Sequence, residues 1–437
     1  MYRQATPPGP AAGFDLGGTG ESLARLRAWF AAHGDVYRVF SPSRGAYFYV
    51  INHPDDVQHV LLANHRNYTK GEGMDRVRLL LGNGIMTSEG EFWRRQRRMI
   101  QPAFHRRVLA LLDTLIGEVN DKYAARWSAQ AARREPLDVA AETSAMTLEI
   151  VLRSIFSCDL ERLKRRLGEN PFDVVATETI RDLRFAYRFR SLARLIGELA
   201  AQRRTEPRGE VDFLAMLMSA RSHDTGEHMS ETELVDEVMT LIVAGHETTA
   251  AALAWTWHLL GRHPDAAERL HAEADRAANE RTDAAGPVRL EEAEALPFTR
   301  QVIQEALRLY PPGWLFTRRS IEADRLGGYA IGPRTDVFIS PYMLHRHPAF
   351  WDAPEQFRPE RFDGPDAEER HRFAYIPFSV GPRHCVGENL AMFEMLVHVS
   401  AFSRRFRLAP VNDDPVELEA QINLRPRAKL MMTVEER

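Results

Sequence analysis

Residues 378–387 read Phe-Ser-Val-Gly-Pro-Arg-His-Cys-Val-Gly, and a predicted helix follows from Glu388 onward. Cys385 therefore stands in a glycine-rich loop that enters a helix. Nearby backbone N–H groups and the positive end of the helix dipole favour the thiolate form of such a cysteine. Because thiolate is the form that ligates iron, the stretch predicts an iron-binding cysteine. A lone cysteine without these neighbours would more often be a buried core residue.

The residues around Cys385 suit a flat macrocycle. Gly381 and Gly387 let the backbone approach such a ring closely, because neither carries a Cβ atom. Phe378 can pack against the ring, and Arg383 can pair with a carboxylate such as a propionate.

At every fixed position this stretch matches the Phe-x-x-Gly-x-Arg-x-Cys-x-Gly loop of the cytochrome P-450 family, which the chain resembles. The resemblance extends over nearly the whole chain, with four motifs in the family's order. It implies heme b (iron protoporphyrin IX) as the cofactor and Cys385 as the ligand of its iron. It also implies that Phe378, Arg383 and Gly387 bind the cofactor.

A second motif, Ala-Gly-His-Glu-Thr-Thr at residues 244–249, falls inside a long predicted helix that begins after a capping box at residues 230–233. A glycine there costs about 1 kcal/mol relative to alanine, which suggests that Gly245 leaves room for a diatomic ligand. The Thr248 hydroxyl can bond back to the Ala244 carbonyl. Without a ligand, the same segment would be a simple helix kink.

The second motif matches the family's oxygen-binding groove, which implies that Glu247 and Thr248 relay protons. A zinc peptidase is the competing interpretation, because His246-Glu247 begins the His-Glu-x-x-His motif. That motif needs a second histidine at position 250, where the chain has Ala250. The zinc interpretation is therefore excluded.

A third motif places Glu305 and Arg308 on one face of a helix, three residues apart. Taken alone, such a pair usually marks a solvated helix surface. The resemblance implies that both residues join Arg361 in a buried structural network. We expect substitution there to cause loss of heme or misfolding, since it would disrupt a carboxylate flanked by two guanidiniums.

Three further residues are expected to bind the heme propionates by resemblance: Trp93 and Arg97 on one helix, and Arg319 with Arg318 as the less favoured choice. Further arginines surround Trp93 and Arg97 and form a local basic cluster, which suggests a docking patch for an acidic electron-transfer protein. The alternative for each arginine is a solvated charged face. The other arginines of the cluster are Arg94, Arg95, Arg98, Arg106 and Arg107.

Composition limits the remaining classes of function. The chain has 437 residues, with 57 Lys+Arg against 61 Asp+Glu and a formal net charge of −4, so nothing global attracts nucleic acid. The amino terminus shows no secretory signal or membrane anchor. Two cysteines cannot form a disulfide framework, which indicates a reducing compartment or a thiol kept for chemistry, and we expect a cytoplasmic protein. Cys158 follows an apolar pair and is expected to be a small structural core residue.

The predicted fold is mainly α with small β-sheets (α+β), the cytochrome P-450 fold with a long central I-helix over the heme. Helical spacing and the lack of linkers predict one catalytic domain over residues 1–437. Residues 203–210 are expected to be a polar loop. Only about 55 residues separate Phe156 from the helix predicted at 212–220, where the family places two long helices and a loop over the substrate. Either this lid is trimmed or residues are absent from the chain.

The predicted function is a heme-dependent monooxygenase that hydroxylates a lipophilic, terpenoid or fatty-acid-like small molecule. By resemblance, a separate ferredoxin or flavodoxin with an NAD(P)H-dependent reductase supplies electrons, and the protein is expected to be a monomer. The expected pocket is apolar, although core packing is an equal alternative for each member. Its candidates are Met86, Ala244, Trp314, Leu315, Phe316 and Leu424.

Two other classes of function remain open from the sequence. A peroxide-driven peroxygenase or an isomerase would keep the heme thiolate but would not need Glu247 and Thr248. A non-catalytic heme-binding sensor would bind ligands without turnover with any electron donor.

Overall fold

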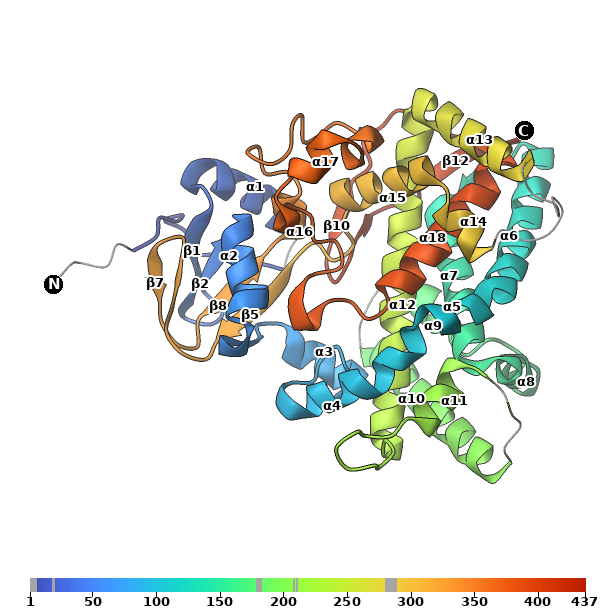
Figure 1. The fold of residues 1–437 in the computed structure, drawn as a ribbon, viewed down its shortest axis with the longest axis horizontal. Helices are drawn as coiled ribbons and strands as arrows, with labels where there is room; N and C mark the ends of the chain where they lie inside the picture. The colour runs from blue at the N-terminus through green and yellow to red at the C-terminus, as the bar shows by residue number, and fades with distance from the viewer. Residues whose placement is uncertain (1–5, 18–19, 178–182, 207–208, 210, 280–288) are drawn as a thin grey trace. The chain divides into compact units, whose positions relative to one another are not determined.

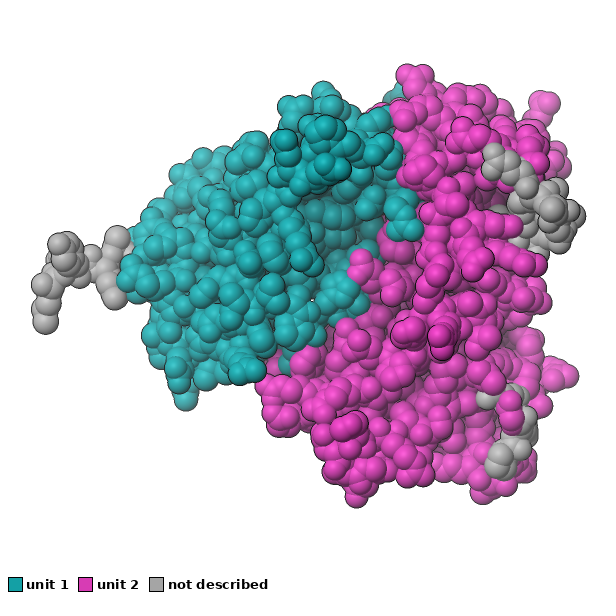
Figure 2. Space-filling view, viewed as in Figure 1, with its two compact units in different colours: residues 1–74, 300–385, 413–428 teal, residues 75–299, 386–412, 429–437 magenta. Residues whose placement is uncertain are grey.

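The computed structural model describes residues 6–17, 20–177, 183–206, 209, 211–279 and 289–437. Helices predominate and the sheets are small (Figure 1), as the sequence predicts. The chain divides into two compact units, each built from separate stretches of sequence (Figure 2). Unit 1 comprises residues 1–74, 300–385 and 413–428, and unit 2 comprises residues 75–299, 386–412 and 429–437. A single catalytic domain stays a prediction.

Unit 1 is built on a five-stranded sheet with the order β1-β2-β8-β5-β3. Only the β2–β8 pair is parallel, and the other neighbours are antiparallel. The strands are β1 (Val36–Ser41), β2 (Ala46–Ile51), β8 (Asp336–Ile339), β5 (Phe316–Ser320) and β3 (Tyr68–Lys70).

Each face of this sheet carries its own hydrophobic core, because successive strand residues point to opposite sides. Phe48 and Phe338 lie on the face that helix α1 (Ser22–His33) covers with Leu26 and Trp29. Residues of the opposite face pack against the segment formed by α2 (Pro54–Gln58) and its π-helical continuation, His59–Ala63.

The rest of unit 1 is made of short elements. Its hairpins are β6 (Asp324–Leu326) with β7 (Tyr329–Ile331), and β10 (Leu418–Ala420) with β11 (Leu424–Pro426). Its short helices are α16 (Pro341–Leu344), α17 (Pro365–Glu369) and 3-10 turns at His65–Asn67, Pro359–Phe362, Arg372–Ala374 and Gly381–Arg383. Helix α15 (Pro297–Leu309) begins in unit 2 and continues into unit 1.

Unit 2 is organised around helix α12 (Glu231–Arg262), whose 32 residues give it a length of about 48 Å. The predicted capping box is present, with Ser230 and Glu233 each bonded to the other's backbone N–H. Helix α7 (Val139–Phe156) packs along α12 and makes its most extensive helix contact.

Other helices surround this pair in unit 2. They are α3 (Met74–Leu81), α4 (Gly90–Ile100), α5 (Arg106–Leu109), α6 (Asp113–Arg133), α8 (Cys158–Leu167), α9 (Asp173–Thr177), α10 (Leu183–Thr205), α11 (Phe213–Ser219), α13 (Pro264–Asn279), α14 (Leu290–Glu294) and α18 (Glu388–Ser403), with 3-10 turns at Gln101–Phe104 and Ala110–Leu112. A three-stranded sheet has the order β4 (Leu137–Asp138), β12 (Met431–Glu436), β9 (Phe406–Pro410).

Between Phe156 and Asp212, the described residues (157–177, 183–206, 209 and 211) contain one long helix and two short ones. Helix α10 has 23 residues, whereas α8 has 10 and α9 has 5. The expected loop at residues 203–210 is wrong at its start, because α10 continues to Thr205. Arg203 is almost fully buried there and pairs with Asp159 at 2.7 Å and Asp212 at 2.7 Å. It thereby joins α10 to the starts of α8 and α11.

The expectation for Cys158 is also wrong, since its side chain is exposed. Ser157 ends α7 with a positive φ of 46° and turns the chain directly into α8, which places Cys158 on the first turn of that helix. The apolar pair before it belongs to α7 and is buried. Proximity to that pair in sequence therefore did not make Cys158 a core residue.

Candidate active site

The loop that carries Cys385 is fixed by its own backbone. The Cys385 N–H donates to the Phe378 carbonyl at 3.0 Å, and the His384 N–H donates to the Gly381 carbonyl at 3.0 Å. The Cys385 thiol is exposed, and α18 begins three residues later with Gly387 as its N-cap. The loop thus presents one sulfur donor immediately before a helix N-terminus, as predicted.

Gly381 serves this loop in a different way from the one expected. Its φ is +76°, and a Cβ atom at this position would lie 2.1 Å from the carbonyl oxygen of Leu61. The absence of a side chain therefore lets the loop pack against the π-helical segment of unit 1. Close approach to a macrocycle is not needed to explain this glycine.

The donor set fits a heme. In the described part of the chain, no three His, Cys, Asp or Glu side chains are grouped so that they could hold a metal ion. A heme brings the nitrogen ligands of its porphyrin, so the protein needs to supply only the sulfur donor. The exposed Cys385 would supply a thiolate ligand to such an iron.

The second motif lies in α12, and its threonine behaves as predicted. The Thr248 hydroxyl donates to the Ala244 carbonyl at 2.7 Å, one turn back. Ala244, Glu247 and Thr248 are all half-buried. The hydroxyl oxygen of Thr248 keeps lone pairs that can accept a further hydrogen bond.

Gly245, which the sequence assigned to a diatomic ligand, has a role in helix packing. A Cβ atom on Gly245 would lie 3.1 Å from Cγ2 of Val151 on α7. The glycine therefore lets α7 approach α12 closely.

Hydroxyl groups of α7 contact the part of α12 that carries the second motif. The His246 Nε2 lies 2.9 Å from the Ser144 hydroxyl, and His246 is 1% exposed. The Thr147 and Thr143 hydroxyls donate at 2.9 Å to carbonyls one turn back in α7. They also lie 3.4 Å from the carbonyl of His246 and 3.2 Å from the carbonyl of Ala250, respectively. These contacts position the turn that carries Glu247 and Thr248.

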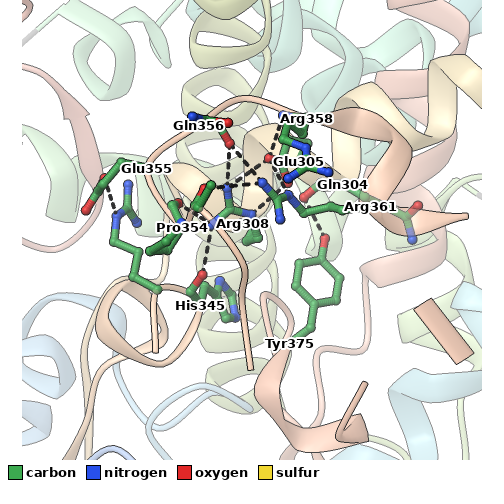
Figure 3. Close-up of polar contacts among 12 residues, drawn as sticks. Gln304, Glu305, Arg308, His345, Pro354, Glu355, Gln356, Arg358, Arg361 and Tyr375 are labelled. Atoms are coloured by element: carbon green, nitrogen blue, oxygen red, sulfur yellow. Dashed lines mark hydrogen bonds and ion pairs between the residues drawn. The ribbon is translucent and has the colours of Figure 1, made fainter. Parts of the chain in front are cut away.

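Glu305, Arg308 and Arg361 come together in a buried network, as the resemblance implied (Figure 3). Arg308 binds both carboxylate oxygens of Glu305, at 2.7 and 2.8 Å, and Arg361 binds one of them at 2.9 Å. Glu305 and Arg308 are 0% exposed. The remaining guanidinium protons are donated to backbone carbonyls, including those of His345, Pro354 and Gln356.

His345 links this network to the chain that leads into the cysteine loop. Its carbonyl accepts from Arg308, and its Nε2 accepts from the N–H of Ile376 at 2.9 Å. Burial, followed by the charges of Arg308 and Arg346, holds the pKa of His345 well below its ordinary value. The imidazole is therefore neutral, as an acceptor at Nε2 requires. Nothing in the local sequence indicated this role.

The arginines expected near the propionates have different partners in the structure. On β5, Arg319 makes a bidentate ion pair with Asp336 at 2.8 and 2.9 Å. Arg318 is the next residue along the strand and points to the other face, with its guanidinium 5.2 Å from the centre of the Phe316 ring. On α4 of unit 2, Trp93 is buried at 9% exposure and Arg97 is half-buried.

The basic cluster is largely neutralised by acidic neighbours. Four of its arginines form ion pairs with acidic side chains. The pairs are Arg94 with Glu91, Arg95 with Glu233, Arg98 with Asp224, and Arg106 with Glu294. The expected docking patch is therefore a surface of alternating charge, which weakens the case for it.

Two expected pocket residues are core residues of unit 1. Trp314 is 1% exposed and Leu424 is 0% exposed, and both pack in the core beneath α1. The Trp314 indole donates to the Gln421 carbonyl at 2.9 Å. Leu315 packs against the same core, and Phe316 packs against the core on the opposite face of the sheet.

Comparisons with known proteins agree with this geometry. The family model described as Cytochrome P450 matches residues 8–174 and 169–434. "Cyclooctatin synthase" of Streptomyces melanosporofaciens is 35% identical, over 97% of this chain and 94% of that protein. "Cyclooctat-9-en-7-ol 5-monooxygenase" of the same organism is 35% identical, over 87% of this chain and 84% of that protein.

"Pentalenene oxygenase" of Streptomyces avermitilis is 31% identical, over 88% of this chain and 87% of that protein. Among solved structures, the heme domain of cytochrome P450DA is similar in fold, with a TM-score of 0.85 and 24% identity, covering 99% of this chain and 98% of that one. The chain belongs to the cytochrome P450 family of heme-dependent monooxygenases, and its cofactor is heme b.

Proposed function

We propose that this monooxygenase hydroxylates a lipophilic terpenoid, with electrons from a separate ferredoxin or flavodoxin and an NAD(P)H-dependent reductase. The observation that carries the substrate class is the similarity to relatives named for pentalenene and for cyclooctat-9-en-7-ol. The pocket candidates that remain half-buried in unit 2, Met86 and Ala244, are apolar and suit such a molecule. This support favours a terpenoid over a fatty acid.

When bound, the heme supplies dioxygen activation and the oxidation of a C–H bond. Cys385 is the residue that holds its iron. Phe378, Gly387 and Arg383 of the same loop are proposed to contact the ring and a propionate. Their shared role is to fix the orientation of the cofactor rather than to take part in proton transfer.

Glu247 and Thr248 are proposed as the catalytic residues of this chain. The Thr248 hydroxyl is already oriented, because it donates to the Ala244 carbonyl. Its oxygen can accept one hydrogen bond from bound solvent and so hold a proton source in place. Glu247, the residue before Thr248, is half-buried and is proposed to act with it in the proton relay.

Trp93, Arg97 and an arginine of β5 are proposed to bind the heme propionates. We favour Arg318 for the last position, because the guanidinium of Arg319 is already engaged by the buried carboxylate of Asp336. Releasing Arg319 would leave Asp336, which is 4% exposed, with fewer partners and would be costly.

Glu305, Arg308 and Arg361 are proposed to have a structural role. Their network ties α15 to residues 352–358 and, through His345, to Ile376. Ile376 lies two residues before Phe378, whose carbonyl holds Cys385. The network therefore acts on the shape of the cysteine loop and not on the reacting atoms.

In the described part of the chain, we find no helix that combines the length and the apolar character needed to cross a membrane. The monomeric state and a single catalytic domain over residues 1–437 remain our expectations.

The test is turnover of pentalenene and cyclooctat-9-en-7-ol by the heme-loaded protein with NADPH and a surrogate ferredoxin and reductase. We expect a hydroxylated product that depends on both redox proteins. Product formed with hydrogen peroxide alone would instead identify a peroxygenase. Heme spectral shifts without turnover under either condition would identify a sensor.

A further inference from the structure

Two adjacent carboxylates of α12 hold the loop that contains Met86. The backbone N–H of Asn83 donates to Asp236 Oδ2 at 2.7 Å, and the backbone N–H of Ile85 donates to Glu237 Oε2 at 2.8 Å. Glu237 is 0% exposed. Both bonds have a carboxylate acceptor, which makes them stronger than bonds between neutral groups.

Two glycines allow this loop to lie against the helix. A Cβ atom on Gly84 would lie 2.3 Å from the Thr240 hydroxyl and 2.7 Å from the Asp236 carbonyl oxygen. Gly82 has a φ of +68°, and a Cβ atom there would meet the Asp236 carboxylate at 2.1 Å. The loop and α12 are therefore in backbone contact, and any larger residue would push them apart.

The loop is also closed on itself on the far side of Met86. The N–H groups of Thr87 and Ser88 both donate to the Gly84 carbonyl, at 3.0 and 2.9 Å. The Thr87 hydroxyl donates to the Gly82 carbonyl at 2.7 Å, and Arg78 donates to the Thr87 carbonyl at 2.6 Å. Met86 is thus held on both sides, between the clamped Ile85 and the buried Thr87.

The clamp lies on the side of α12 that carries the candidate catalytic threonine. Ala244 and Thr248 follow Glu237 by seven and eleven residues, about two and three helical turns, so all three share one face. Along the axis, Glu237 is about 10 Å from Ala244. The bond to Ile85 therefore sets where Met86 lies relative to Ala244 and Thr248.

We propose that Asp236 and Glu237 are positioning residues that fix Met86 and thereby determine which substrate sizes the pocket accepts. The inference rests on the proposed function, in that Met86 and Ala244 contact a lipophilic substrate. It does not depend on that substrate being a terpenoid. Neither carboxylate has to touch the substrate or the heme.

The test uses 1-alkylimidazoles as probes, because their imidazole nitrogen binds heme iron whatever the natural substrate is. Dissociation constants are read from heme spectral shifts for 1-methylimidazole and for 1-octylimidazole. Their ratio measures how the pocket accepts a long apolar tail, and hydrogen exchange of the Ile85 amide measures the clamp. A failed terpenoid assay would leave both readings intact.

In Glu237→Ala, we expect faster exchange at Ile85 and a change in the ratio of about fivefold or more, the factor that the loss of one hydrogen bond of ~1 kcal/mol produces. Glu237→Gln keeps an acceptor oxygen and should stay within about twofold of the original ratio. Met86→Ala should change the ratio as Glu237→Ala does, and the double variant should add little more.

The matched control is Glu231→Gln, an exposed acid on the first turn of the same helix. It should change neither reading. An unchanged ratio in Glu237→Ala together with faster exchange would overturn the proposal, because the clamp would then stabilise the loop without affecting the pocket. Unchanged exchange would overturn it as well. If Glu237→Ala does not incorporate heme, Asp236→Ala carries the same test with the same outcomes.

Discussion

The imidazole of His246 on α12 meets the hydroxyl of Ser144 on α7, with 2.9 Å between Nε2 and Oγ. This contact lies directly behind Glu247 and Thr248. It fixes the rotation of the helical turn that carries them, because His246 is buried and has little freedom to move. The side of α12 opposite the candidate catalytic residues thus contributes to their placement.

Ser144→Ala tests this relationship. We expect normal heme content and a two- to fivefold fall in the fraction of NADPH electrons recovered in product, about what the loss of one hydrogen bond allows. Product and hydrogen peroxide are measured against NADPH consumed. The matched control is Ser154→Ala on the same helix, whose hydroxyl donates within α7 to the Ile150 carbonyl. Equal coupling in the Ser144 and Ser154 variants would count against the positioning role.

Thr248→Ala tests the proton relay itself. The variant should keep its heme and consume NADPH while releasing mainly hydrogen peroxide, because no hydroxyl remains to hold the proton source. Thr256→Ala is a close control, since Thr256 makes the same bond one turn back, to the Ala252 carbonyl at 2.8 Å. Unchanged coupling in Thr248→Ala would contradict the assignment.

Sequence patterns predicted the features that depend on local chemistry or on a motif. The capping box at Ser230 and the back-bond of Thr248 are of the first kind, because each involves residues within one turn. The network of Glu305, Arg308 and Arg361 is of the second kind. The spacing of Glu305 and Arg308 alone was a weak signal, and the family resemblance identified Arg361 as the distant partner.

The sequence could not show which neighbouring element each residue would face. Gly245 and Gly381 were assigned to ligand space, but they face Val151 and Leu61 across packed segments. The preference for Arg319 over Arg318 was made without knowledge of Asp336, because the pairing of Arg319 with Asp336 on β8 depends on strand register. The clamp by Glu237 was missed for the same reason, since its partner is a backbone N–H about 150 residues earlier.

Substitution in the buried network should affect folding rather than catalysis. Glu305→Gln leaves two guanidiniums with a neutral partner, and we expect a loss of about 3–5 kcal/mol in the free energy of unfolding, with poor heme incorporation. Glu368→Gln, an exposed acid on α17, should change neither quantity. The measurement is urea unfolding together with the heme-to-protein ratio. A stable, heme-loaded Glu305→Gln protein with reduced turnover would show that the role is catalytic.

Glu394 on α18 predicts a pH dependence of stability. It is 2% exposed, and burial raises its pKa from 4.5 to about 8. The folded protein therefore keeps this proton between those values, whereas the unfolded chain releases it. The stability that the folded protein gains by holding this proton is fully present below pH 4.5. As the pH rises toward 8, the free energy of unfolding falls by up to about 1.4 kcal/mol per pH unit.

Glu394→Gln should remove this slope, because the amide stays neutral throughout. Urea midpoints at about pH 5 and about pH 8 give the comparison, and the exposed Glu435→Gln is the control. A variant whose stability declines with pH as steeply as that of the unmodified protein would show that Glu394 is ionised in the folded state.

The most direct test of the account is the absorption spectrum of the reduced, CO-bound protein. A cysteine thiolate at the iron should give the red-shifted Soret band from which the family takes its name, and Cys385→Ala should abolish that band while Cys158→Ala leaves it unchanged. The shorter-wavelength band of a histidine-ligated heme, or a protein that takes up no heme, would contradict the assignment of Cys385.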